Sequence, residues 1–460
     1  MDDSVLRVRP RPRERLASGT DGSELIHRAA DARDPRKVVD VGEKRRSERD
    51  GSSVMEVVIG KRTRKNDRNV YVLGAGFSVD AGLPTVANFL NHMRDAADWL
   101  TETHNENGMR AVAKVLEFRH SAAAAGYRIN IDLDNVEDLF SLASALPAQQ
   151  LRRAMQTAIG ATLHYSEVHG VPREVRMRIL RGASWPVTTE WLARVSRISS
   201  SGQGEEGSDD VFCSIYDYYA AILAGRTSDL RADDNVVLTF NYDLLLEDSL
   251  ATLGIPFTYG LGSDAVVYDE SARCRPTGGT DILTVLKLHG SLNWYQGERT
   301  PLTVCGSFNE VPDRTPYVVP PTWDKDVAGI TQRTWSAAVE ALRQATRVII
   351  IGFSFRVIDA HFKYLLAAGL MNNSALRKIV VIDPQASKLA NQIRSVIRRD
   401  QFKYGIVDLH DRRLHEFAMT PDDLEGIGRP LRHGAMAVIE LEREVRLLRD
   451  DTGFYVDPKY

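Results

Sequence analysis

The chain has few cysteines, no long apolar run and little net charge, and each of these shortages argues against a class of protein. Its three cysteines, Cys213, Cys274 and Cys305, lie far apart and form no CxxC pair, which argues against a disulfide framework and a four-cysteine zinc site. No apolar stretch approaches the roughly 20 residues that span a bilayer, and the N-terminus lacks the apolar centre of a signal peptide. We therefore expect a cytoplasmic protein that uses no metal.

The net charge and the length of the chain further limit the classes of protein to which it can belong. The net charge of −3 predicts no general attraction to nucleic acid or to anionic membranes. The hydrophobic content of 43% is ordinary for a globular protein with a substantial core. A chain of 460 residues holds two or three domains, or one long α/β unit.

Residues 1–66 are predicted to form a disordered leader. The strings LRVRPRPRERL and EKRRSERDGSS show neither strand nor helix spacing of apolar residues, so there is no face to bury. The alternative is a basic tail that contacts nucleic acid or a partner, but interspersed acidic residues favour a solvated segment. Translation from Met55 instead of Met1 is a further alternative, because Met55 comes just before the first expected strand.

Five apolar runs each end in small or polar residues. They occupy residues 70–84, 236–243, 285–294, 347–359 and 378–387. Such runs are typical of buried parallel strands that deliver polar residues to one edge of a sheet, where open α/β folds bind ligands. Five in series predict a nucleotide site on a Rossmann-like, doubly wound and mostly parallel α/β sheet.

The remaining segments fit around this sheet. Apolar residues recur every three or four positions within residues 89–232, which predicts a large α-helical insertion over the ligand edge. We place the α/β domain at residues 67–400 and expect a C-terminal helical extension over residues 401–460. Within that extension, the amphipathic segment 436–450 suits packing on the core or on another copy of the chain.

The first run ends in a glycine-rich loop. Gly74, Ala75 and Gly76 directly follow a strand, and Ser78 and Gly82 precede a helix. Small residues let backbone amides approach a diphosphate, and a helix N-terminus favours its charge. The spacing differs from the dinucleotide fingerprint, because the glycine after G-x-G comes six residues later instead of three. The G-K-S/T triplet of a P-loop is also missing.

Taken in order, four motifs resemble those of the sirtuin-like family. They are G-A-G-F-S-V-D-A-G-L-P from Gly74 to Pro84, T-F-N-Y-D from Thr239 to Asp243, the pair His289-Gly290, and G-F-S from Gly352 to Ser354. The resemblance covers residues 69–400. It implies that NAD lies over the glycine loop, with the asparagine, aspartate and histidine around its nicotinamide ribose.

Two departures indicate one branch of that family. The D-F-R string and the four-cysteine zinc ribbon of protein-deacylating sirtuins are absent. Residues 317–326 and the string Asn135-Val136-Glu137 resemble instead a bacterial branch associated with NAD hydrolysis in anti-phage defence. The resemblance implies a gated NAD hydrolase without zinc that works as a homo-oligomer or with a partner such as an ATPase, a nuclease or an Argonaute-like protein.

Three residues at the strand ends then have expected catalytic roles. Cleavage of the nicotinamide–ribose bond passes through an oxocarbenium-like state with a neutral leaving group, so the enzyme must hold the ribose and orient one nucleophile. Asn241 suits positioning a water or a ribose hydroxyl, and Asp243 suits holding the carboxamide or bracing Asn241. His289 suits accepting a proton, since histidine titrates near neutrality.

The resemblance also implies binding roles. Phe77 is expected in a flexible loop, as an apolar wall against nicotinamide. Ser354 is expected near the phosphates and Asp383 near the adenosine ribose. Thr239 and Gly352 belong to the matched cofactor-binding motifs.

Simpler explanations remain for several of these residues. Asn241 and Asp243 also suit a turn or cap at a strand end, and His289 also suits a structural histidine, although their occurrence together with the glycine loop favours a site. Asn135 resembles a helix N-cap, and a site role for Glu137 is the alternative. The alternatives to hydrolysis are an NAD-dependent protein deacylase and a non-catalytic module that senses NAD or an ADP-ribose derivative.

Overall fold

The core of the protein is a parallel sheet, described by a computed structural model. That structure describes residues 68–147, 149–172, 176–180, 211–225, 235–262, 264, 266–275, 282–296, 301–308, 315–322, 329–355, 360–403, 405–411 and 413. All of them belong to one unit, residues 63–460. The predicted leader and the amphipathic segment 436–450 lie outside the described residues.

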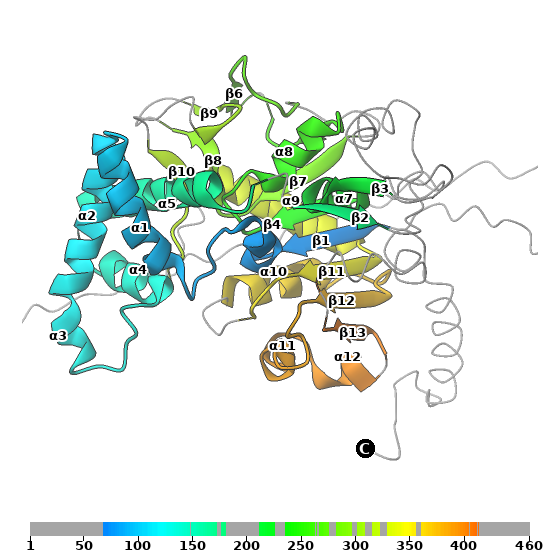
Figure 1. Cartoon of the computed structure of the whole chain (residues 1–460). Coiled ribbons are helices and arrows are strands. Elements are labelled where there is room, and N and C mark those ends of the chain that lie inside the picture. The colour runs from blue at the N-terminus through cyan, green and yellow to red at the C-terminus, as the bar shows by residue number, and fades with distance from the viewer. Residues whose placement is uncertain are drawn as a thin grey trace, which may run out of the picture. The chain divides into compact units, whose positions relative to one another are not determined.

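Seven described strands form this sheet in the order β13-β12-β11-β1-β4-β7-β5, and each neighbouring pair is parallel (Figure 1). The strands are β1 (Asn69–Leu73), β4 (Val236–Thr239), β5 (Phe257–Thr258), β7 (Leu283–Lys287), β11 (Arg347–Ile351), β12 (Lys378–Ile382) and β13 (Val407–His410). The five predicted runs supply β1, β4, β7, β11 and β12. The seventh strand, β13, lies beyond residue 400, where a helical extension was expected to begin, so the sheet reaches further along the chain than predicted.

Alternate residues of each strand enter two separate hydrophobic cores, because successive side chains in a strand point to opposite faces. Val70 and Val72 pack on one face with α9 (Ile330–Gln344), α10 (Ala360–Leu370) and α11 (Ala390–Val396). Tyr71 and Leu73 pack on the other with α7 (Ile215–Leu223) and α8 (Leu245–Thr252). Helices therefore cover both faces, which confirms the predicted doubly wound α/β fold.

The chain order reverses at β1, which pairs with both β4 and β11. From β1 the chain builds β4 and β7 on one side, and it later returns to build β11, β12 and β13 on the other. Connections on the two sides diverge at such a switch point, which opens a crevice at the carboxyl ends of the strands. The glycine loop follows β1 and Gly352 follows β11, so both lie at this crevice.

The insertion between β1 and β4 is mainly helical. Its first five helices are α1 (Phe89–Glu102), α2 (Glu106–Ser121), α3 (Ala123–Gly126), α4 (Val136–Ser144) and α5 (Gln149–His169). Asn105 caps α2 by accepting a hydrogen bond from the Gly108 amide at 2.8 Å, and α1, α2 and α5 pack on one another. The insertion also contains an antiparallel pair, β2 (Met177–Leu180) and β3 (Val211–Ser214), which the helical prediction missed.

A smaller mixed sheet is formed by one strand that precedes β7 and three that follow it. Its order is β10-β8-β9-β6, with bounds β6 (Val266–Tyr268), β8 (Gly290–Tyr295), β9 (Leu302–Val304) and β10 (Pro316–Val318). The insertion reaches this sheet through α5, which packs against β10 (Figure 1). Two short helices complete the described elements, the 3-10 helix η1 (Ala75–Ala81) and α12 (Arg399–Lys403).

The loops after β1 and β11 cross in direct backbone contact. A Cβ atom on Gly74 would lie 2.5 Å from the Gly352 carbonyl oxygen, and one on Gly352 would overlap the backbone of Gly76 and Phe77. Gly352 also has a φ of +60°, which disfavours other residues. Glycine is therefore required on both sides of this crossing.

We predict that Gly352→Ala destabilises the protein by about 1–3 kcal/mol more than Gly405→Ala, because only the first substitution overpacks a neighbour. Gly405 is a matched control, since its φ is +64° and nothing lies within 4 Å of its added Cβ. Both variants carry the left-handed strain of about 1–2 kcal/mol. Urea unfolding measures the difference, and equal losses would show that the crossing tolerates a methyl group.

Candidate functional site

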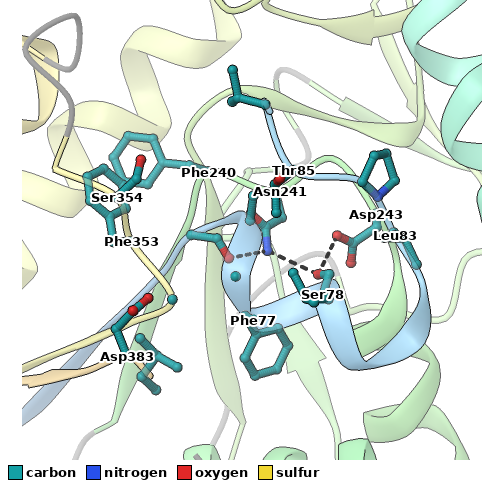
Figure 2. Close-up of a pocket in the computed structure, with 18 of the residues that line it drawn as sticks. Phe77, Ser78, Leu83, Thr85, Phe240, Asn241, Asp243, Phe353, Ser354 and Asp383 are labelled. Carbon is teal, nitrogen blue, oxygen red and sulfur yellow. Dashed lines mark hydrogen bonds between the residues drawn. The ribbon is translucent and has the colours of Figure 1, made fainter. Parts of the chain in front are cut away.

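A cavity of about 450 Å³ lies at the carboxyl edge of the sheet. The loops after β1, β4, β7, β11 and β12 line it, together with residues of α1, α4 and α5 from the insertion. Its volume is typical of small-molecule sites, and its position is the crevice where open α/β sheets bind ligands. Figure 2 shows this cavity with Asn241 near its centre.

Most of the residues singled out in the sequence line this cavity. They are Gly74, Ala75, Gly76, Phe77, Ser78, Asn241, Asp243, His289, Gly352, Ser354 and Asp383. Thr239 and Gly82 do not. Thr239 instead accepts a hydrogen bond from the Asn241 amide at 3.1 Å, and Gly82 ends η1 with a φ of +84°, so both shape the loops behind the cavity.

Asn241 has a fixed orientation. Its side-chain amide donates to the Gly74 carbonyl at 2.9 Å and to Ser78 Oγ at 3.2 Å (Figure 2). Because a carbonyl can only accept, the Nδ2 atom must face Gly74, and Oδ1 takes the other position. No donor among the described residues forms a hydrogen bond with Oδ1, which leaves this oxygen to accept from a ligand hydroxyl or a water.

Asp243 is bound on both carboxylate oxygens. Ser78 donates to Oδ2 at 2.7 Å, and the Leu245 amide donates to Oδ1 at 3.2 Å. Burial raises the pKa of Asp243, and the nearby Lys287 ammonium opposes that rise. Since Ser78 also contacts Asn241, this arrangement supports the bracing role for Asp243 over direct contact with a carboxamide.

A buried lysine holds the turn that carries these residues. Lys287 Nζ donates to Glu247 Oε1 at 2.9 Å, to the Asp243 carbonyl at 2.5 Å and to the Tyr242 carbonyl at 3.4 Å. The side chains of Lys287 and Glu247 are only 1% and 6% exposed. The sequence reasoning missed this pair, although a lysine inside the apolar run at 283–288 was a usable signal.

His289 is held between two aromatic rings. Its ring lies 5.0 Å from Phe240, edge to face, and 6.2 Å from Tyr242. The Val319 amide donates to the His289 carbonyl at 2.8 Å, and the Tyr242 hydroxyl donates to the Val319 carbonyl at 2.6 Å. These contacts fix the histidine at the cavity wall, where its side chain is 7% exposed.

The insertion places a carboxylate in the same wall. Asn135 accepts from the Glu137 amide at 2.9 Å and caps α4, as predicted. Glu137 itself lines the cavity and is 6% exposed. Burial raises the pKa of Tyr242, and the Glu137 charge adds to that rise; both residues line the cavity. The N-terminus of α4 therefore has both features: Asn135 caps the helix, and Glu137, two residues later, lines the cavity.

The glycine loop differs from the expected phosphate cradle. The amides of Gly74, Gly76 and Phe77 donate to the carbonyls of Ile351, Gly352 and Gly74 at 2.9–3.0 Å. The three N–H groups are therefore engaged within the protein, and the glycines serve the close crossing of two loops.

Phe77 is also more firmly held than expected for a flexible loop. Its ring lies 5.5 Å from both Tyr216 and Tyr219 of α7, and the Tyr216 hydroxyl donates to the Phe77 carbonyl at 2.9 Å. The residue is 5% exposed and still contributes to the cavity wall.

Ser354 and Asp383 lie on the other side of Asn241 from Asp243 (Figure 2). Ser354 is exposed. Asp383 accepts from the Gln385 amide at 2.8 Å, and partial burial raises its pKa. Arg413, which follows β13, lines the cavity as well, and the sequence reasoning missed it because that region was expected to be helical.

The described part of the chain has neither a cluster of metal ligands nor a membrane-spanning helix. No group of three or more histidine, cysteine, aspartate or glutamate side chains is arranged to hold a metal ion there. None of the helices in that part combines the length and the apolar character needed to cross a membrane.

Comparison with known proteins gives one family match. Residues 235–404 match the family described as "SIR2-like domain", a stretch that runs from β4 to α12 and excludes the glycine loop and the insertion. A SIR2-like domain suggests an NAD-related activity. No curated protein sequence matches the chain.

Solved structures of Sir2 proteins show distant similarity. A Sir2 homologue in complex with NAD is 13% identical, with 82% of this chain and 92% of that chain covered and a TM-score of 0.34. A mutant Sir2 homologue in complex with 2′-O-acetyl ADP ribose is 13% identical, with 81% and 95% covered and a TM-score of 0.33. TM-scores this low do not establish a common fold, so the fold described above depends on its own strand order and registers.

We predict that Lys287→Met lowers the free energy of unfolding by about 3–5 kcal/mol, because it leaves Glu247 buried without its charge partner. The matched control is Lys378→Met, whose pair with Asp408 is partly exposed and is worth about 1 kcal/mol or less. The double variant Lys287→Met/Glu247→Leu should recover part of the loss. Urea unfolding of all three variants tests this, and equal losses for Lys287→Met and Lys378→Met would contradict it.

A second prediction concerns Glu167 on α5. Burial and the nearby Asp243 and Asp248 charges raise its pKa from 4.5 to about 8. Since the folded state holds this proton more tightly than the unfolded chain, the associated stability is complete below pH 4.5 and is lost as the pH rises toward 8. Glu167→Gln should therefore gain thermal stability relative to wild type across this range.

The control for this pH series is Glu270→Gln, which changes an exposed glutamate. Thermal unfolding midpoints of the three proteins should show a growing gap only for Glu167→Gln as the pH increases. A gap that is the same at both ends of the range would mean that Glu167 does not titrate there.

Proposed function

We propose that the protein hydrolyses NAD at the nicotinamide–ribose bond, so that NAD and water give ADP-ribose, nicotinamide and a proton. One observation carries this proposal. Asn241, its brace Asp243, and His289 meet at one cavity, at the switch point of the sheet. These residues lie within the segment that matches the SIR2-like family.

The contacts of these residues suit that chemistry. The Asn241 Oδ1 atom accepts no hydrogen bond from the described residues, so it can accept one from a ribose hydroxyl or from the attacking water. His289 is in position to take the proton that the nucleophile loses. Nicotinamide leaves as a neutral molecule, so positioning and exclusion of other water matter more than acid catalysis.

The aliphatic side chains of the insertion support exclusion of water. Val136, Ile159 and Leu163 line the cavity beside Glu137. In the proposed reaction they replace bulk water around the reacting bond, which strengthens each polar contact made there.

We further propose that this activity is gated and serves anti-phage defence by depleting NAD. Unrestrained hydrolysis of a central cofactor would harm the cell, so the enzyme needs a trigger. Self-assembly, or a partner such as an ATPase, a nuclease or an Argonaute-like protein, is the proposed source of that trigger.

The decisive experiment measures nicotinamide release from NAD over a range of protein concentrations. We expect turnover by the wild type and a loss of about 100-fold or more in Asn241→Ala and His289→Ala, because each variant removes a positioned group. Matched controls are Asn372→Ala and His120→Ala, which change exposed residues outside the cavity and should keep full activity.

Two results would contradict the proposal. A folded wild type that binds NAD but releases no nicotinamide, even with candidate partners added, would indicate a sensor. Transfer of an acyl group from a peptide with equal release of nicotinamide would indicate a deacylase.

A further inference from the structure

The charges that line the cavity are unbalanced. Four carboxylates line it, from Asp80, Glu137, Asp243 and Asp383, and Arg413 is the only lysine or arginine among the described lining residues. A dianionic ligand such as a diphosphate is repelled by this set unless a cation or backbone amides face it. The position of Arg413 therefore decides where such a group can bind.

Several backbone amides around the crevice are already hydrogen-bonded within the protein. The N–H groups of three glycine-loop residues already donate to backbone carbonyls, as shown above. On the opposite side, the Gly352 amide donates to the Ile382 carbonyl at 3.0 Å and the Asp383 amide to the His410 carbonyl at 3.1 Å. With these five N–H groups paired, the guanidinium of Arg413 is the one lysine or arginine side chain among the described lining residues that can face a phosphate.

Arg413 joins two parts of the chain that are distant in sequence. It follows β13 at one edge of the sheet, and its guanidinium forms an ion pair with Asp80 on η1. The two residues are 333 positions apart. Their side chains are 49% and 20% exposed, so the pair lies at the rim of the cavity, where an entering ligand can reach it.

We propose that Arg413 binds the diphosphate of the substrate, and that it exchanges Asp80 for phosphate oxygens when the ligand enters. The planar guanidinium presents paired N–H groups that match two phosphate oxygens, as they match a carboxylate. The ligand class is a nucleoside diphosphate ester such as NAD or ADP-ribose. This inference rests on the proposed function, because it assigns the diphosphate of that substrate.

The exchange has a consequence for Asp80. In the free protein this carboxylate occupies Arg413, so it competes with the incoming diphosphate. Removing its charge should strengthen diphosphate binding, and the gain should be larger while Arg413 is present. A purely structural ion pair would show no such dependence.

Calorimetric titration of ADP-ribose into the full chain tests the exchange, because ADP-ribose is not cleaved at the proposed bond. We expect Arg413→Ala to weaken ADP-ribose binding about 10-fold or more, as for loss of a hydrogen bond to a charged group. Arg413→Lys should lie between this variant and wild type, since it keeps the charge and loses the fork. Arg398→Ala, in an exposed pair with Asp400, is the control and should bind normally.

The double-mutant cycle is the sharper test. Asp80→Asn should tighten ADP-ribose binding clearly more in the wild-type background than in the Arg413→Ala background, where it removes only the repulsion between the Asp80 carboxylate and the diphosphate. In the hydrolysis assay, Arg413→Ala should raise KM for NAD with little change in kcat, since the diphosphate lies away from the bond that breaks.

The outcomes separate this inference from the proposed function. If Arg413→Ala and Arg413→Lys fold, as judged by thermal unfolding, and bind ADP-ribose as wild type does, the inference is wrong while NAD hydrolysis stands. Equal losses of thermal stability in Asp80→Asn and Arg413→Ala, without a change in ADP-ribose affinity, would mean that the ion pair only stabilises the fold, and the inference would be wrong. If the wild type binds neither NAD nor ADP-ribose, both proposals fail.

Discussion

The arrangement of the site depends on one buried ammonium group. Lys287, at the end of β7, reaches Glu247 on α8 and two carbonyls of the turn after β4. A charge removed from water is costly unless every partner is in place. The lysine therefore fixes β7, α8 and the turn relative to one another. These contacts hold the chain next to each of Asn241, Asp243 and His289.

A steric constraint operates at the switch point beside it. The loops after β1 and β11 cross so closely that glycine is required at Gly74 and Gly352. At this crossing the backbone N–H groups of Gly74 and Gly76, which could otherwise bind a phosphate, donate to carbonyls of the loop after β11 and its strand. The same residues that make the crevice possible thus leave it short of positive charge, and the only described cationic group that lines the cavity arrives from the far end of the sheet, after β13.

The two constraints give the cavity distinct regions. Near Asn241 and His289 the wall includes the aromatic ring of Tyr242, which lies 6.2 Å from the His289 ring, and the carboxylate of Glu137. At the rim, Arg413 and Asp80 form an ion pair within reach of solvent. NAD has the matching polarity, since its nicotinamide carries positive charge and its diphosphate negative charge. The insertion adds the Glu137 carboxylate and an aliphatic wall, so it contributes to the cavity as well as to the core.

Local pattern in the sequence determined the parallel sheet and the strand-end residues. An apolar run that stops at Asn241, His289 or Gly352 indicates both a buried strand and the position of its end. Parallel strands bring these ends to one edge of the sheet. Only the tertiary structure decided which groups pair. Lys287 and Glu247 are 40 positions apart, and Asp80 and Arg413 are 333 apart. No sequence periodicity indicates such partners, because they are set by the packing of distant elements. β13, with the sequence VDLH, also lacks the continuous apolar run of a buried parallel strand.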